Sequence, residues 1–119
     1  MPAPAESDRM LTVEQEDPHA ERTRIAYRDA VRMWRGRAHC AFDPLWQSGA
    51  IGRQQAYFWL AFQLGLDWHP HIGRLSTSAC QRVVRVMRLA KKAGYAESVA
   101  MWRRGEKLVD MSPPTEVEL

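Results

Sequence analysis

The stretch RQQAYFWLAFQLG, residues 53–65, decides the fold. Its apolar side chains are spread over nearly every helical face: Tyr57, Phe58, Trp59, Leu60, Phe62 and Leu64. A helix that is apolar almost all round is usually central and buried. Gly65 suits the left-handed position that ends a helix. We therefore predict a central helix over residues 53–64.

Further helical patterns lie on both sides of this stretch. Before it, Asp17-Pro18 predicts a helix start, and the helix is expected to run to about residue 41. Asp43-Pro44 is expected to end or kink this helix, because the residue before a proline avoids helical geometry. Its apolar seam recurs at helical spacing: Tyr27, Val31, Trp34 and Ala38. After it, Ser76 or Thr77 caps a helix that reaches residue 93, ahead of Gly94. The apolar face of that helix is Cys80, Val83, Val84 and Met87.

A short fourth helix is expected over residues 97–108, with Val99 and Trp102 turned inward. The fold class is therefore all-α, a compact bundle of three or four helices. Residues 18–110 form the helical domain. Residues 1–17 and 111–119, rich in acids and proline, are expected to be disordered acidic tails.

Charge is segregated along the chain. Residues 1–21 carry a net charge of −5, residues 22–104 of +11, and residues 105–119 of −3. A basic body between acidic ends indicates an anionic partner, either nucleic acid, DNA or RNA, or an acidic protein surface.

Two arginine rows are the candidate nucleic-acid-binding residues. One follows the first helix and the other the solvent side of the third: Arg24, Arg28, Arg32 and Arg35, then Arg82, Arg85, Arg88 and Lys92. Arg53 and Arg74 add to them from the turns. Arginine forms bidentate contacts with phosphate, whereas the alternative is a solvated face whose stems cover the core edge.

A surplus of apolar groups on the central helix is a candidate protein interface. Phe58, Trp59 and Phe62 exceed what a small bundle can cover, so we expect part of this face to be exposed. A homodimer that places two arginine rows side by side is a further hypothesis.

A metal site is the alternative that the spacing disfavours. The candidate ligands are His39, Cys40, His69, His71 and Cys80, and they lack the short paired spacing of structural zinc sites. Cys80 lies on an apolar stripe, where a thiol behaves as a small hydrophobe. We therefore expect no metal, no cofactor and reduced cysteines, with a Cys40–Cys80 disulfide as the less favoured reading.

The composition also disfavours several function classes. The chain has no glycine-rich phosphate loop, no paired carboxylates and no supported nucleophile–base pair, so we expect a binding protein and not an enzyme. It has no apolar run long enough for a membrane span and no signal-peptide pattern. A cytoplasmic location with no membrane partner is the corresponding expectation.

The middle of the chain resembles a known family. The residues that carry the resemblance are His39, Phe42-Asp43, Leu45-Trp46, Arg53, Ala56-Tyr57, Leu60-Ala61, Leu64-Gly65, His71-Ile72-Gly73, Cys80 and Val83-Val84. Over residues 34–88 this order is similar to the C-terminal helical segment of an uncharacterised zinc-finger-containing family of bacterial and phage proteins. The CxxC pairs of that family's N-terminal zinc ribbon are absent here. The resemblance implies a phage, prophage or plasmid context.

Two functions follow as expectations. The first is a small phage or mobile-element accessory protein that binds nucleic acid through its arginine-rich helical faces. The alternative is a protein-interaction module that inhibits a host nucleic-acid-processing or defence complex, as an anti-CRISPR protein does. A structural subunit whose basic face has no ligand is a third hypothesis.

Overall fold

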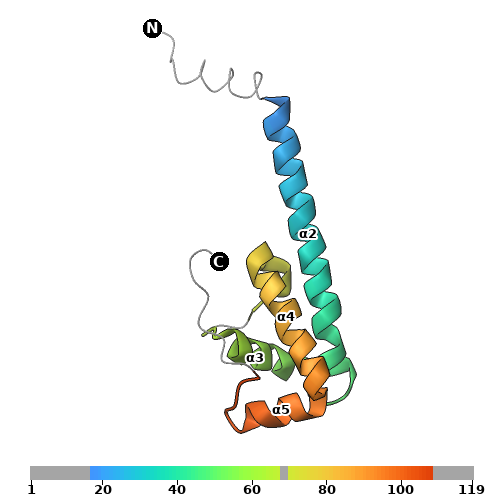
Figure 1. Cartoon of the computed structure of the whole chain (residues 1–119), viewed down its shortest axis with the longest axis vertical. Helices are drawn as coiled ribbons and strands as arrows, with labels where there is room; N and C mark the ends of the chain where they lie inside the picture. The colour runs from blue at the N-terminus through green and yellow to red at the C-terminus, as the bar shows by residue number, and fades with distance from the viewer. Residues whose placement is uncertain (1–16, 68–69, 109–119) are drawn as a thin grey trace. The chain divides into compact units, whose positions relative to one another are not determined.

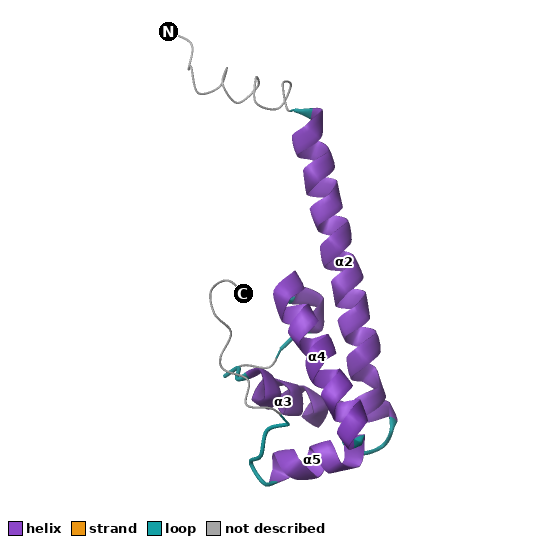
Figure 2. Ribbon diagram, in the orientation of Figure 1, coloured by secondary structure: helices purple, strands orange, loops and turns teal. Residues whose placement is uncertain are grey.

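The protein is all-α, as the sequence predicts. The computed structural model describes residues 17–67 and 70–108, and Figures 1 and 2 show only helices and loops in these ranges. The elements are α2 (Pro18–Gln47), α3 (Arg53–Leu64), the 3-10 helix η1 (Ile72–Arg74), α4 (Thr77–Ala93) and α5 (Tyr95–Arg103). The predicted tails lie outside the described residues, apart from Asp17.

Two compact units divide the chain at residues 30 and 31. The predicted helical domain, residues 18–110, covers parts of both. In the first unit, α2 begins as predicted, because the N–H of His19 donates to Asp17 Oδ1 at 2.9 Å. Tyr27 is 66% exposed, so its predicted place in the apolar seam is wrong. Periodicity marks a helical face, but only packing decides where along the helix that face is covered.

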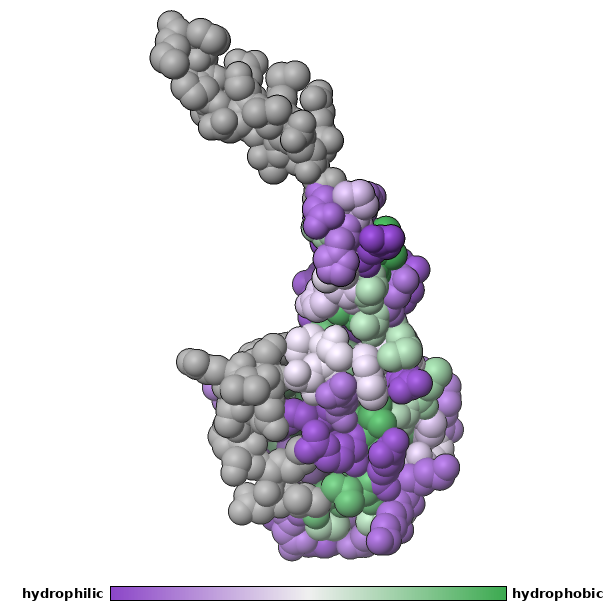
Figure 3. Space-filling view, turned by 45° about the horizontal axis from the view of Figure 1, so that its top comes forward, coloured by the Kyte–Doolittle hydropathy of each residue, from purple (hydrophilic) through white to green (hydrophobic). Residues whose placement is uncertain are grey.

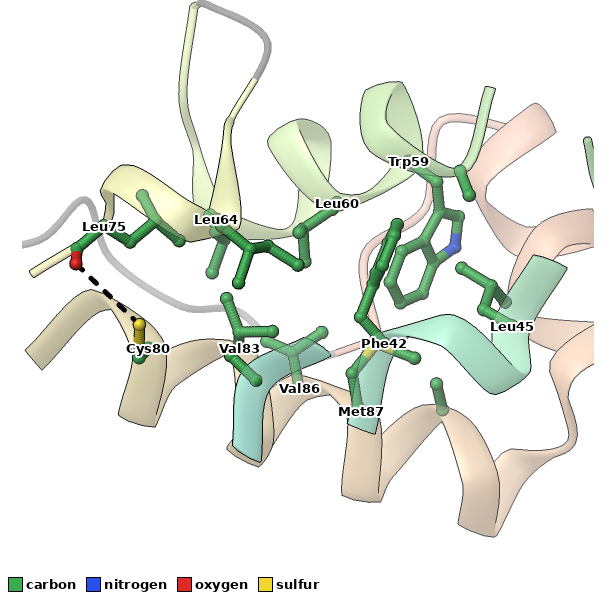
Figure 4. Packing of buried hydrophobic residues seen from close by; sticks show 14 of the residues in the cluster. Phe42, Leu45, Trp59, Leu60, Leu64, Leu75, Cys80, Val83, Val86 and Met87 are labelled. Atoms are coloured by element: carbon green, nitrogen blue, oxygen red, sulfur yellow. Dashed lines mark hydrogen bonds between the residues drawn. The ribbon is translucent and has the colours of Figure 1, made fainter. Parts of the chain in front are cut away.

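The core lies in the second unit. Figure 4 shows Phe42 of α2 beside Trp59 of α3, and Leu60 and Leu64 of α3 facing Val83 of α4. Trp59, Phe42, Leu60 and Val83 are fully buried. The central position predicted for residues 53–64 is confirmed by this packing.

Helix α2 runs past Pro44, which was expected to end or kink it. It continues to Gln47, and the N–H of Ser48 donates to the carbonyl of Pro44 at 2.9 Å. The interior proline costs about 3 kcal/mol relative to alanine. Full burial of Leu45, the residue after this proline, contributes about 1.5–3 kcal/mol in the opposite direction, and the indole N–H of Trp46 donates to Asp43 Oδ1 at 3.2 Å. Tertiary packing thus outweighs the local preference.

The ends of α3 and α4 agree with prediction. Gly65 has a φ of 70°, and the N–H of Leu66 donates to the carbonyl of Ala61 at 2.9 Å. Ser76 is the residue that caps α4, where its Oγ accepts from the N–H of Ala79 at 3.1 Å. The end of α3 and the start of α4 therefore lie where capping chemistry places them.

Helix α5 is shorter than predicted and begins earlier. It spans Tyr95–Arg103, whereas residues 97–108 were expected. Ser98 accounts for the early start, because its Oγ donates to the carbonyl of Gly94 at 2.8 Å and is buried at the α4–α5 junction. Gly105, with a φ of 78°, accounts for the early end.

Candidate nucleic-acid interface

The predicted α2 row is divided between the two units. Arg24 and Arg28 belong to the first and are exposed. Arg32 and Arg35 belong to the second. Arg32 is exposed, whereas Arg35 is half-buried and its Nε–H donates to the carbonyl of Leu75 at 3.0 Å. Arg35 therefore ties α2 to the loop before α4.

One residue of the predicted basic row on α4 is not accessible to solvent. Arg82 was expected on the solvent side, but it is only 3% exposed, and its Nη2 donates to the carbonyl of Leu64 at 3.2 Å. That carbonyl lies at the end of α3, where a cation is favourable because the helix dipole is negative there. The placement of Arg82 on an accessible surface is wrong.

The other cations of α4 remain accessible. Arg85, Arg88, Lys91 and Lys92 are exposed, and we call them the α4 cations. Helix α4 contains no acidic residue. Within the described residues, the ion pairs are those of Arg104 with Glu97 at 3.3 Å and with Glu106 at 3.1 Å. The α4 cations therefore present unneutralised charge to the solvent.

A shallow groove lies beside the α4 cations. Helix α4 runs alongside the C-terminal part of α2 in the same direction (Figure 1), with Arg35 near Leu75 at one end. Toward the other end, Cys40 and Ala41 of α2 line a groove of about 220 Å³ opposite Arg88 and Lys91. Sequence reasoning missed Lys91 and this groove, because a helical pattern does not tell which face of one helix meets another.

Arginine and aromatic rings are stacked elsewhere on the second unit. The guanidinium of Arg37 lies 4.9 Å from the centre of the Trp34 ring, and that of Arg53 lies 5.4 Å from the ring of Trp46. Arg37 was not among the predicted residues. Arg53 and Arg74 are exposed, as their turn positions suggest. Such stacking holds a cation at the surface and leaves its outer face accessible.

The predicted protein interface is reduced to two residues. Phe58 is 50% exposed and Phe62 is half-buried, with Lys107 Nζ 5.5 Å from its ring centre. Trp59, by contrast, is fully buried, and its Nε1–H donates to the carbonyl of Ser98 at 3.2 Å. Its assignment to an exposed interface is wrong, because α5 covers the face of α3 that carries it.

The candidate metal ligands do not come together. Among residues 17–67 and 70–108, no group of three or more His, Cys, Asp or Glu side chains could hold a metal ion. Cys40 is exposed on α2, whereas Cys80 is buried with its Sγ 3.9 Å from the carbonyl of Leu75. Burial raises the pKa of the Cys80 thiol, and nearby Arg35 lowers it by less. His69 lies outside the described residues.

None of the described helices combines the length and apolar content needed to cross a membrane. Figure 3 shows one face of the described part, on which hydrophilic side chains surround smaller hydrophobic patches.

Comparison with known proteins identifies the family. No match was found among curated proteins or solved structures. A family described as a zinc-finger-containing domain matches residues 8–90, a wider range than the 34–88 expected from the motif. The match covers more than half of the 119 residues, and the chain therefore belongs to the zinc-finger-containing domain family.

Proposed function

We propose that the protein binds nucleic acid through the α4 cations. The observation that carries the proposal is four exposed cations on a helix without acidic residues, none of them in an ion pair among the described residues. Such a cluster creates a positive potential that attracts a polyanion. Arginine and lysine on one helical face can then contact successive phosphates.

The family supports the same class of function. Its description as a zinc-finger-containing domain is compatible with nucleic-acid binding. The chain has two cysteines, and within residues 17–67 and 70–108 no group of three or more His, Cys, Asp or Glu side chains could hold a metal ion. The proposal therefore assigns binding to the helical part alone, in a protein that acts as an accessory factor of a phage or mobile element and not as an enzyme.

Salt dependence of binding tests the proposal. Fluorescence anisotropy with labelled DNA and RNA, from about 50 to about 200 mM salt, measures how many phosphates are neutralised. We expect a steep slope for the full chain. The triple variant Arg85→Ala/Arg88→Ala/Lys92→Ala should lose about one unit of slope for each phosphate contact removed.

A matched control removes the same charge elsewhere. Arg22, Arg103 and Arg104 are exposed and lie outside α4, so Arg22→Ala/Arg103→Ala/Arg104→Ala lowers the net charge equally. This variant should keep most of the slope. An equal loss in both variants would mean that overall charge, and not the α4 surface, drives binding. Absence of binding at the lowest salt would refute the proposal.

Phe58 supports a second candidate function. Its ring is 50% exposed beside half-buried Phe62, so an apolar contact is available on α3. A partner held here, such as an inhibited host nucleic-acid-processing or defence complex, would stay bound at salt concentrations that release nucleic acid. A homodimer through the same residues stays a hypothesis that light scattering can test.

A further inference from the structure

The groove between α2 and α4 has an apolar floor. Ala41 and Val84 are half-buried, and Met87 is 2% exposed. Tyr95, the first residue of α5, lines the groove and is also half-buried. The groove therefore offers an aromatic ring and aliphatic side chains to a flat or compact apolar group.

The rim of the groove is basic. Arg88 and Lys91 are exposed and three residues apart, which places them on neighbouring turns of one face of α4. None of the residues that line the groove is acidic. An occupant that combines an apolar group with negative charge matches both parts of this site.

Duplex nucleic acid does not fill such a groove well. A duplex keeps its bases stacked and presents phosphates and sugars, whereas a single strand can place an unstacked base against the protein. Single-strand binding sites typically combine a positive surface with an aromatic side chain on which a base stacks. Arg88, Lys91 and Tyr95 supply these elements in one place.

We infer that the groove between α2 and α4 binds single-stranded nucleic acid, with a base on the apolar floor beside Tyr95 and its phosphates on Arg88 and Lys91. The inference rests on the proposed function and specifies its substrate class. A base on the apolar floor also accounts for the apolar part of this site, because a duplex would need only the basic part.

Cys40 provides a direct reporter of this groove. It lines the groove and is exposed, whereas Cys80, the other cysteine of the chain, is buried. In the folded protein we expect iodoacetamide to alkylate Cys40 and to leave Cys80 unmodified, as mass spectrometry of peptides can establish. A strand in the groove would cover Cys40 and slow its alkylation.

The test compares two probes on the full-length protein. A saturating oligo(dT) of about 16 nucleotides, the upper range of single-strand site sizes, should slow Cys40 alkylation about tenfold. A duplex of equal phosphate number should leave the rate nearly unchanged. If high salt restores the rate of Cys40 alkylation, phosphate contacts are responsible for the protection.

A substitution provides the second measurement. Tyr95→Leu keeps apolar volume but removes the ring, so single-strand affinity should fall about tenfold while duplex affinity stays the same. Tyr95→Phe keeps the aromatic ring, so its single-strand affinity should equal that of the unchanged protein. Tyr27→Leu is the matched control, because Tyr27 is exposed outside the groove and should not affect affinity. Circular dichroism checks that each variant is folded.

The outcomes separate this inference from the proposed function. Salt-dependent binding without protection of Cys40 would leave the proposed function standing and overturn the groove as its site. Equal protection by duplex and single strand would overturn the substrate class. Protection that grows with protein concentration in the absence of DNA would assign the groove to a second copy of the chain and overturn the inference. If neither the single strand nor the duplex binds, both the proposed function and the groove inference are refuted.

Discussion

At the scale of single residues, Trp59 connects three helices. Its Nε1–H donates to the carbonyl of Ser98 on α5, and the Oγ of Ser98 donates to the carbonyl of Ala90 on α4 at 3.2 Å. Trp59 itself belongs to α3 and is fully buried. Ser98 lies within α5, so its carbonyl has a helical donor and the indole N–H adds a second hydrogen bond, which contributes about 0.5–1.5 kcal/mol beyond the burial of the ring.

Substitution of Trp59 should separate the two contributions. Trp59→Phe, which removes the N–H, should lower the free energy of unfolding by about 0.5–1.5 kcal/mol through the lost hydrogen bond. Trp59→Ala also opens a cavity and should lower it by about 3–5 kcal/mol. Urea unfolding followed by circular dichroism measures both. Phe58→Ala is the neighbouring control, and a loss there as large as that of Trp59→Ala would contradict the burial pattern.

Arg82 and Arg85 illustrate what residue spacing can and cannot predict. Both belong to a basic pattern on one helix, yet Arg82 is buried against the carbonyl of Leu64 and Arg85 is exposed. The sequence indicates that α4 is amphipathic. It does not indicate that the end of α3 will lie within reach of one arginine, because that depends on how two distant helices pack.

At the scale of elements, predicted helix ends are accurate where capping chemistry is local. Ser76 and Gly65 delimit α4 and α3 through their own backbone and side-chain geometry, so both ends could be predicted. The end of α2 could not, because it depends on burial of Leu45 by residues far along the chain. Long-range packing, and not helix propensity, therefore explains why α2 continues past Pro44.

Pro44 should therefore be a site where stability can be gained. Pro44→Ala restores a backbone N–H to the helix and removes the steric conflict of the ring with the preceding turn. We expect the free energy of unfolding to rise by about 1–3 kcal/mol, measured by urea denaturation. Ala41→Gly, a change toward lower helix propensity one turn earlier, should act in the opposite direction. A loss of stability in Pro44→Ala would show that the ring is needed in the groove that it lines.

At the scale of the whole molecule, burial of apolar side chains joins the described helices into one core. The core joins α2, α3, α4 and α5 through residues such as Phe42, Trp59, Val83 and Val99. Cys40 is exposed and Cys80 is buried, and neither belongs to a group of three or more possible metal ligands within residues 17–67 and 70–108. The fold class could be predicted from helical periodicity, whereas the groove required the packed arrangement of α2 against α4.

Removal of metal should thus leave the fold intact. We expect EDTA to have no effect on the thermal midpoint, because hydrophobic packing rather than zinc stabilises the helices. Circular dichroism melting with and without chelator measures this. Loss of a structural zinc would lower the midpoint by at least several degrees, since about 1 kcal/mol corresponds to about 4–8 °C in a domain of this size. Recovery on addition of Zn²⁺ would contradict the expectation.

The shared direction of α2 and α4 has an electrostatic consequence. Peptide dipoles in parallel helices add instead of cancelling, so the carbonyl ends of both helices create partial negative charge at one pole of the second unit. Helix α2 has no basic residue in its last turn, whereas α4 has Lys91 and Lys92 there. These two ammonium groups lie in the field of the α4 C-terminus, which offsets about half an elementary charge and leaves most of their positive charge for an incoming phosphate.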